Sequence, residues 1–139
     1  MANRWFTQFP KTLEKEVCSI YARVTFGSSG APTLDTTNSK GIVSVTRNSA
    51  GKYTFVFGTN SGMLDTYNRL LMVETYYDST GNSGTAPTAP LTYLTGNSIA
   101  TAGTASLQLV MTNTSGTATD PASTEVWLFK FELKNSTAP

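Results

Sequence analysis

The residue types that commonly carry enzyme chemistry are scarce in this chain. It has no histidine and a single cysteine, Cys18, among 139 residues. Without histidine, neither a Ser-His-Asp triad nor a Cys-His pair can form, and the usual zinc motifs are excluded as well. Cys18 lies in the apolar run 17–21, where we expect a small, partly buried side chain rather than a nucleophile. A lone cysteine also forms no disulfide within the chain.

Carboxylates and short motifs offer no better candidate for catalysis. Asp35, Asp65, Asp78 and Asp120 each stand alone in expected loops, and Glu14 and Glu16 lie close together near the N-terminus. No spacing predicts a glycosidase-type pair. Residues 49–52 match the Ser-x-x-Lys pattern of penicillin-binding enzymes, but they fall where a hairpin turn is expected. We therefore expect no catalytic residues, no cofactor and no metal site, and a protein that is not an enzyme.

Composition favours a β protein with a polar but weakly charged surface. Charged residues are 14% of the chain, against about 25% in an average soluble domain. Threonine, which favours strands, is abundant, as are the turn formers serine, asparagine and glycine. The formal net charge is +1 and the arginines are scattered, so no nucleic-acid partner is expected. No apolar stretch approaches the ~20 residues of a membrane span, and no signal peptide is evident. We expect no membrane partner, and assembly in the cytoplasm of the producing cell.

Period-two patterns and turn signals predict an all-β fold, an antiparallel β-sandwich or barrel of about seven strands. The clearest local prediction is a β-hairpin formed by residues 41–48 and 52–57. In the last strand, we expect Trp127 to share the outer face with Glu125. The expected strands are 17–26, 41–48, 52–57, 70–77, 91–95, 106–113 and 125–134. The residues of the last strand expected to point inward, or nearly so, are Val126, Leu128, Phe129, Phe131 and Leu133.

The N-terminal segment differs from the rest of the chain. Residues 1–16 form an expected arm, 17–134 a single β domain and 135–139 a loose C-terminal tail. The arm lacks a sheet pattern, yet it contains large apolar side chains. Aromatic side chains of this kind often anchor protein interfaces, so we expect them to bind a partner subunit; the alternative is that they cover an edge of the protein's own core. The expected anchors are Trp5, Phe6, Phe9 and Leu13.

Several sequence blocks, taken together and in order, resemble a known group of proteins. The blocks are 1–4, 13–15, 39–42, 46–54, 67–73, 116–122 and 133–136. In this combination the chain resembles small structural proteins of tailed-bacteriophage virions, of the head decoration (capsid cement) type. The resemblance implies a β protein that binds the major capsid protein on the outer capsid surface and associates with itself as a homo-oligomer, such as a trimer. The connection 58–65 is longer here than is usual in that group, which leaves the role of this loop open.

The sequence therefore leaves two alternative functions. The first is a non-enzymatic decoration protein that binds and stabilises the capsid shell. The alternative is a carbohydrate- or receptor-binding module of a phage tail fibre or spike, in which exposed aromatic rings would stack on sugars. The residues expected to do so are Tyr76, Tyr77, Tyr93 and Trp127.

Overall fold

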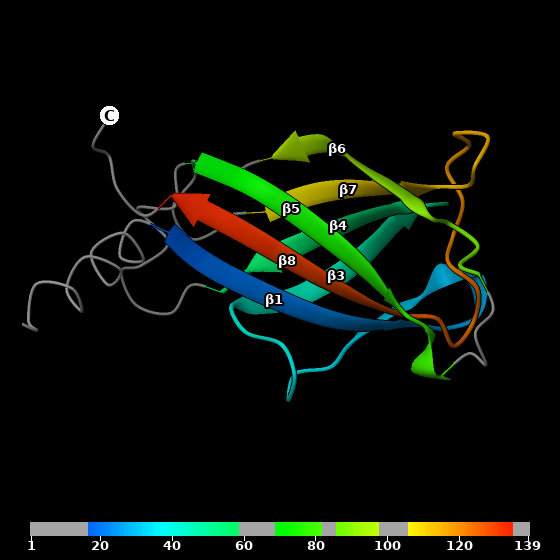
Figure 1. The fold of residues 1–139 in the computed structure, drawn as a ribbon, viewed down its shortest axis with the longest axis horizontal. Helices are drawn as coiled ribbons and strands as arrows, with labels where there is room; N and C mark the ends of the chain where they lie inside the picture. The colour runs from blue at the N-terminus through cyan, green and yellow to red at the C-terminus, as the bar shows by residue number, and fades with distance from the viewer. Residues whose placement is uncertain (1–16, 59–68, 82–85, 98–105, 135–139) are drawn as a thin grey trace, which may run out of the picture.

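The computed structural model describes residues 17–58, 69–81, 86–97 and 106–134. These residues form eight strands and two short 3-10 turns (Figure 1). No helix within them is long and apolar enough to cross a membrane. The elements are β1 (Val17–Phe26), η1 (Ser28–Gly30), β2 (Pro32–Leu34), β3 (Ile42–Ser49), β4 (Lys52–Phe57), β5 (Arg69–Asp78), η3 (Ser79–Gly81), β6 (Leu91–Asn97), β7 (Ser106–Thr112) and β8 (Val126–Lys134).

The strands form two four-stranded sheets that lie as two layers in Figure 1. One sheet has the order β2-β1-β8-β5 and the other the order β3-β4-β7-β6. Neighbouring strands are antiparallel throughout both sheets. The predicted all-β fold is confirmed, and the architecture is a sandwich. The short strand β2 is an addition that the sequence pattern did not indicate.

The hairpin predicted between residues 41 and 57 is present as β3 and β4. Its turn contains Gly51, which has a φ of +67° and is buried. A Cβ atom at this position would lie 2.5 Å from the carbonyl oxygen of Met111 and 2.6 Å from the amide nitrogen of Thr119. The Ser-x-x-Lys match at residues 49–52 is thus a turn in which only glycine fits.

The core lies between the two sheets and is rich in aromatic side chains. The ring of Phe55 on β4 contacts those of Phe129 and Phe131 on β8, with centroid separations of 4.7 and 5.3 Å. Period-two alternation places the apolar residues of each central strand on one face. The buried residues that form this core are Ile20, Ala22, Val24, Phe26, Tyr53, Phe55, Phe57, Ala89, Leu107, Leu109, Met111, Trp127, Phe129, Phe131 and Leu133.

The expected orientation of β8 was wrong at its first residues. Trp127 points inward and is 2% exposed, whereas Leu128 points outward and is 37% exposed. Val126 also lies out of phase with the inward set. Residues 126–129 are all apolar, so either phase of the strand fits this stretch. The observed phase buries the indole and both phenylalanine rings, which remove more apolar surface from water than Val126 and Leu128 would.

The two sides of the sandwich end in different strands. On one side, β2 and β3 lie against each other, and residues 35–40 continue the cover over β1. Lys40 and Tyr21 exchange backbone hydrogen bonds of 2.7 and 3.0 Å, and the amide of Arg23 donates to Ser39. On the other side, β5 and β6 form the outer strands, linked by a 3.1 Å hydrogen bond between Thr75 and Thr92.

Candidate functional site

The arm residues expected to anchor a partner lie outside the described residues. Trp5, Phe6, Phe9 and Leu13 all belong to residues 1–16. Their role as partner-binding anchors therefore stays a prediction.

The four aromatic residues expected to stack on sugars separate into two pairs. Tyr76 and Tyr93 are exposed, at 55% and 51%. Trp127 is buried, and Tyr77 packs against the core, with their ring centroids 5.5 Å apart. Trp127 also donates a 3.0 Å hydrogen bond to the buried carboxylate of Glu125. Trp127 is therefore not accessible for stacking, and Tyr77 is only partly exposed.

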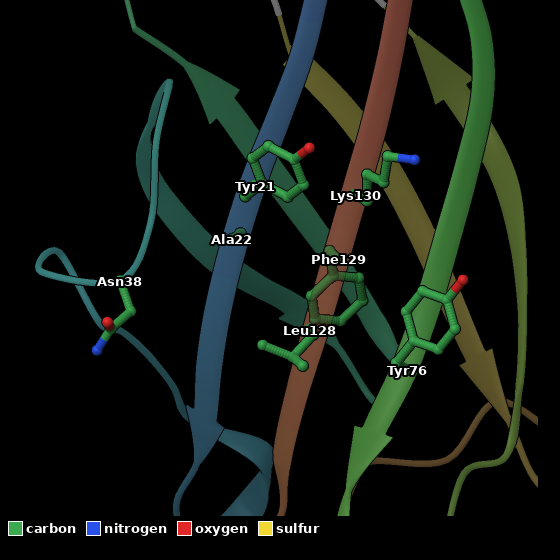
Figure 2. A pocket seen from close by; sticks show the side chains of 7 residues that line it. All are labelled: Tyr21, Ala22, Asn38, Tyr76, Leu128, Phe129 and Lys130. Atoms are coloured by element: carbon green, nitrogen blue, oxygen red, sulfur yellow. The ribbon is translucent and has the colours of Figure 1, made fainter.

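The outer face of the sheet β2-β1-β8-β5 carries a shallow groove (Figure 2). Tyr76 on β5 pairs with Leu128 on β8, and Tyr21 on β1 pairs with the next outward residue of β8, Lys130. Cross-strand pairs share a face, so these side chains from three adjacent strands gather on one surface. The groove is lined by Tyr21, Ala22, Asn38, Tyr76, Leu128, Phe129 and Lys130.

Each of the two cations at this groove, Lys130 and Arg23, is paired with two carboxylates. The ammonium of Lys130 lies 2.8 Å from Glu132 and 3.2 Å from Glu74, and these two contacts raise the pKa of Lys130. Arg23 lies 2.9 Å from Asp78 and 3.8 Å from Asp35. The groove is therefore bordered by paired charges, and its own surface is mainly apolar.

Exposed apolar side chains extend beyond the groove along β5. Met72 pairs with Glu132 and so lies on the same outer face, where it is 40% exposed. We define the outer-face patch as the four large, exposed side chains on β1, β8 and β5 that this register brings together. They are Tyr21, Met72, Tyr76 and Leu128. The Lys130–Glu74 ion pair lies between Met72 and Tyr76 on this face, so the patch combines exposed apolar side chains with paired charges. Exposed apolar side chains that gather on one face mark candidate interaction sites in soluble proteins.

A second exposed apolar region lies on strand β6. Leu91, Tyr93 and Leu94 are 51%, 51% and 44% exposed. The strand contains no charged residue between Leu91 and Asn97. Of this group, only Tyr93 belonged to the site residues expected from the sequence.

The best-connected carboxylate, Asp120, holds the loop before β8 against the β3–β4 hairpin. It accepts hydrogen bonds of 3.0 and 2.7 Å from the guanidinium of Arg47, and one of 2.8 Å from the amide of Gly51. The hydroxyl of Tyr53 lies 2.8 Å away. The Arg47 hydrogen bonds, helped by those from Gly51 and Tyr53, lower the pKa of Asp120 to about 2, while burial, together with Asp120, raises the pKa of Tyr53.

These carboxylates are suited to holding the fold rather than to proton transfer. The pKa of Asp120 is lowered, and hydrogen bonds lower the pKa of Asp35 and Asp78 too. A general acid near neutral pH needs the opposite shift. Within the described ranges, no three histidine, cysteine, aspartate or glutamate side chains gather as a metal site would require. Most of the large, exposed apolar side chains among the described residues lie on the outer-face patch and on strand β6.

Sequence reasoning missed Tyr21 and Leu128 as neighbours because their proximity is not a local feature, and because Leu128 was expected to point inward. Tyr21 alternates with core residues of β1 and could be recognised as outward-facing from the strand period alone. Its proximity to Leu128 depends on the pairing of β1 with β8, residues that are far apart in the chain. Comparison with known proteins adds no assignment for these surfaces, since no family model, curated protein or solved structure matches the chain.

Proposed function

We propose that this chain is a non-enzymatic structural protein that binds other protein subunits as a decoration, or cement, protein on the outer surface of a tailed-bacteriophage capsid. Its partners in this proposal are the major capsid protein and further copies of itself, in a homo-oligomer such as a trimer. The proposal joins the sequence resemblance to one structural observation. That observation is the outer-face patch on a rigid sandwich.

The composition of the patch supports a protein partner. Tyrosine and methionine are enriched in the buried centres of protein interfaces, and charges are depleted there. The nearby charged side chains of Lys130 and Arg23 already have carboxylate partners, so a partner can cover the patch without leaving them unpaired. A charge left unpaired on burial would oppose binding strongly.

The test is binding of the purified chain to capsids of the virus that encodes it, prepared without this protein. Leu128→Asp places a charge at the centre of the patch and should lower occupancy on the capsid at least tenfold, because an unpaired charge must then be desolvated. Val43→Asp is the matched control, since Val43 is 60% exposed but lies on β3 of the other sheet. Equal binding by both variants and the unchanged chain would rule out the patch as the capsid-binding surface.

One observation favours the alternative, a carbohydrate- or receptor-binding module of a tail fibre or spike. Tyr21 and Tyr76 lie on either side of Leu128 in the groove (Figure 2), and tyrosine combines an apolar ring with a polar hydroxyl. Copy number separates the two functions, because a cement protein is present in hundreds of copies per particle and a fibre tip in a few. Quantitative mass spectrometry of particles, together with oligosaccharide titration of Tyr76→Ala, distinguishes them.

A further inference from the structure

Strand β6 is the outer strand of its sheet, and each of its two faces carries an exposed apolar side chain. Tyr93 pairs with Val110 and points outward, whereas Leu94 pairs with the core residue Leu109 and points inward. Leu94 is nevertheless 44% exposed. An inward-facing side chain stays exposed at a sheet edge when no strand lies beside it, and none of the described strands pairs with the free edge of β6. The free side of β6 is therefore the side along which a further strand could form backbone hydrogen bonds, as in strand addition.

The other outer strands carry features that discourage such addition. Strand β2 has three residues and begins with Pro32, and proline cannot donate to a ladder. Strand β3 has two register shifts, and β5 carries charged residues along its length. Strand β6 has one register shift, between Leu94 and Gly96, and neither proline nor charge. Short strands, proline, irregularities and charges are the usual protections of sheet edges, and β6 has the fewest.

We infer that β6 of one copy binds residues 5–9 of a second copy as an added antiparallel strand. This inference rests on the proposed function, in which copies associate with one another. Residues 5–9 have the sequence Trp-Phe-Thr-Gln-Phe and, like β6, contain no charge. Trp5, Thr7 and Phe9 alternate with Phe6 and Gln8, so a strand formed from them offers large aromatic side chains to both Tyr93 and Leu94.

Chain direction favours a second copy over the arm's own β6. Strand β1 begins and β6 ends at the same end of the sandwich (Figure 1). Residues 5–9 of the same chain would therefore come back beside β6 in the parallel sense, whereas every strand pair in both sheets is antiparallel.

An antiparallel arrangement within one chain is also limited by length. The connecting residues 10–16 span at most about 24 Å when fully extended. They would have to run back along about 17 Å of added strand and also pass about 10 Å from one sheet to the other. They would further have to pass β8 and β5, at about 4.8 Å per strand. These distances leave the connection no slack, and a second copy has no such restriction.

Cross-linking between two differently tagged full-length copies tests the inference. One copy carries Phe6→Cys and the other Tyr93→Cys, both with Cys18→Ser, and a short bis-maleimide joins thiols that lie close together. We expect a cross-linked heterodimer in the mixture. Pairing Phe6→Cys with Val43→Cys, on β3, is the control and should give at least tenfold less product. Absence of the Phe6–Tyr93 heterodimer above this control overturns the inference.

A double variant with Phe6→Cys and Tyr93→Cys in one chain tests the arm's own edge. Cross-linking within that chain at a rate independent of protein concentration, without heterodimer in the mixture, shows that the arm covers its own β6 and contradicts the inference. Circular dichroism on each variant confirms that the β fold is retained.

Charged substitutions on β6 give a second measurement. Tyr93→Lys with Leu94→Lys should weaken self-association at least tenfold in sedimentation, because two charges then border the added strand. If self-association is unchanged, strand addition at β6 is wrong, whatever the capsid assay shows. If Leu128→Asp still loses capsid binding in that case, the proposed function stands without this inference. If self-association through β6 is present but capsid binding is insensitive to Leu128→Asp, the proposed capsid-binding surface fails instead.

Discussion

The β2/β3 side and the β5/β6 side of the sandwich differ in how far their outer strands are covered by other parts of the chain. At the β2/β3 side, residues 32–40 cover β1, and Ile42 and Val45 of β3 pack against the core. At the β5/β6 side, large apolar side chains remain exposed on both strands. Because an unprotected sheet edge invites pairing with other chains, a protein that only had to remain monomeric would gain from protecting both sides. We call the β2/β3 side the closed side and the β5/β6 side the open side. Under the proposed function, the exposed apolar side chains of the open side would be covered by a partner.

On the closed side, adding a single Cβ atom at the β3–β4 turn should destabilise the fold. Gly51→Ala places a Cβ atom against two backbone groups at a φ of +67°. We expect the free energy of unfolding to fall by about 3 kcal/mol, from left-handed strain together with the clash. Gly116→Ala is the control, since its φ is +77° but nothing lies within 4 Å of the added atom; it should lose about 1 kcal/mol. Urea denaturation measures both, and equal losses would mean that the close packing at Gly51 relaxes freely.

Equivalent substitutions on the two outer strands of one sheet compare the sides directly. Val45→Lys on β3 removes a side chain that packs on the core and should lower the free energy of unfolding by about 2 kcal/mol or more. Leu94→Lys on β6 changes a side chain that is 44% exposed, and should change it by about 0.5 kcal/mol. If thermal or urea unfolding shows that Leu94→Lys destabilises the protein more than Val45→Lys, then β6 rather than β3 belongs to the closed side.

Acid should weaken the Asp120 contacts that hold the loop before β8 against the β3–β4 hairpin. The pKa of Asp120 is about 2 in the folded protein, against an ordinary value of 3.8. A lowered pKa stabilises the fold at pH values above 3.8, and that stability is lost as the pH falls from about 3.8 towards 2. We expect the urea midpoint to fall over this window, and Asp120→Asn to make the fall shallower. An unchanged slope in Asp120→Asn assigns the acid sensitivity to other carboxylates, such as Asp35 and Asp78.

Removal of residues 1–10 should have the smallest effect on the fold of the β domain and a large effect on its associations. Circular dichroism and the urea midpoint should be unchanged, while capsid occupancy and self-association fall sharply, and Trp5→Ala with Phe6→Ala should reproduce much of the loss. Unfolding of the shortened chain would show instead that these aromatics belong to its own core. Normal association would show that the arm is not the anchor, and would turn attention to the loops at 78–89 and 114–124.

The sequence predicted the elements of the fold well, because the period-two patterns of β1, β4, β7 and the β3–β4 hairpin are local. It did not predict the phase of β8, since Val126, Trp127, Leu128 and Phe129 are all apolar and only packing against the facing sheet distinguishes the two phases. The order of strands has no local signal either.

The candidate site was less predictable for the same reason. Tyr21 reaches Leu128 and Tyr76 only through strand pairing, and Arg47 meets Asp120 across 73 positions of the chain. Tyr76 and Tyr93 were expected as exposed aromatics and are exposed, while Tyr77 and Trp127 were expected so and are not. The arm anchors remain a prediction, as do the capsid partner and the oligomeric state.

The sheet order also sets the sequence in which the protein can fold as it is synthesised. Every strand of the β3-β4-β7-β6 sheet has been made once residue 112 has been added, whereas β1 and β5 both pair with β8, the last strand. Until residues 126–134 follow, β1 has only the three-residue β2 beside it, and β5 has no partner among the described strands. Long-range pairing of this kind slows folding. The last strand to be made is therefore the one on which both of its neighbours depend, and the core can close only after β8 is available to insert between them.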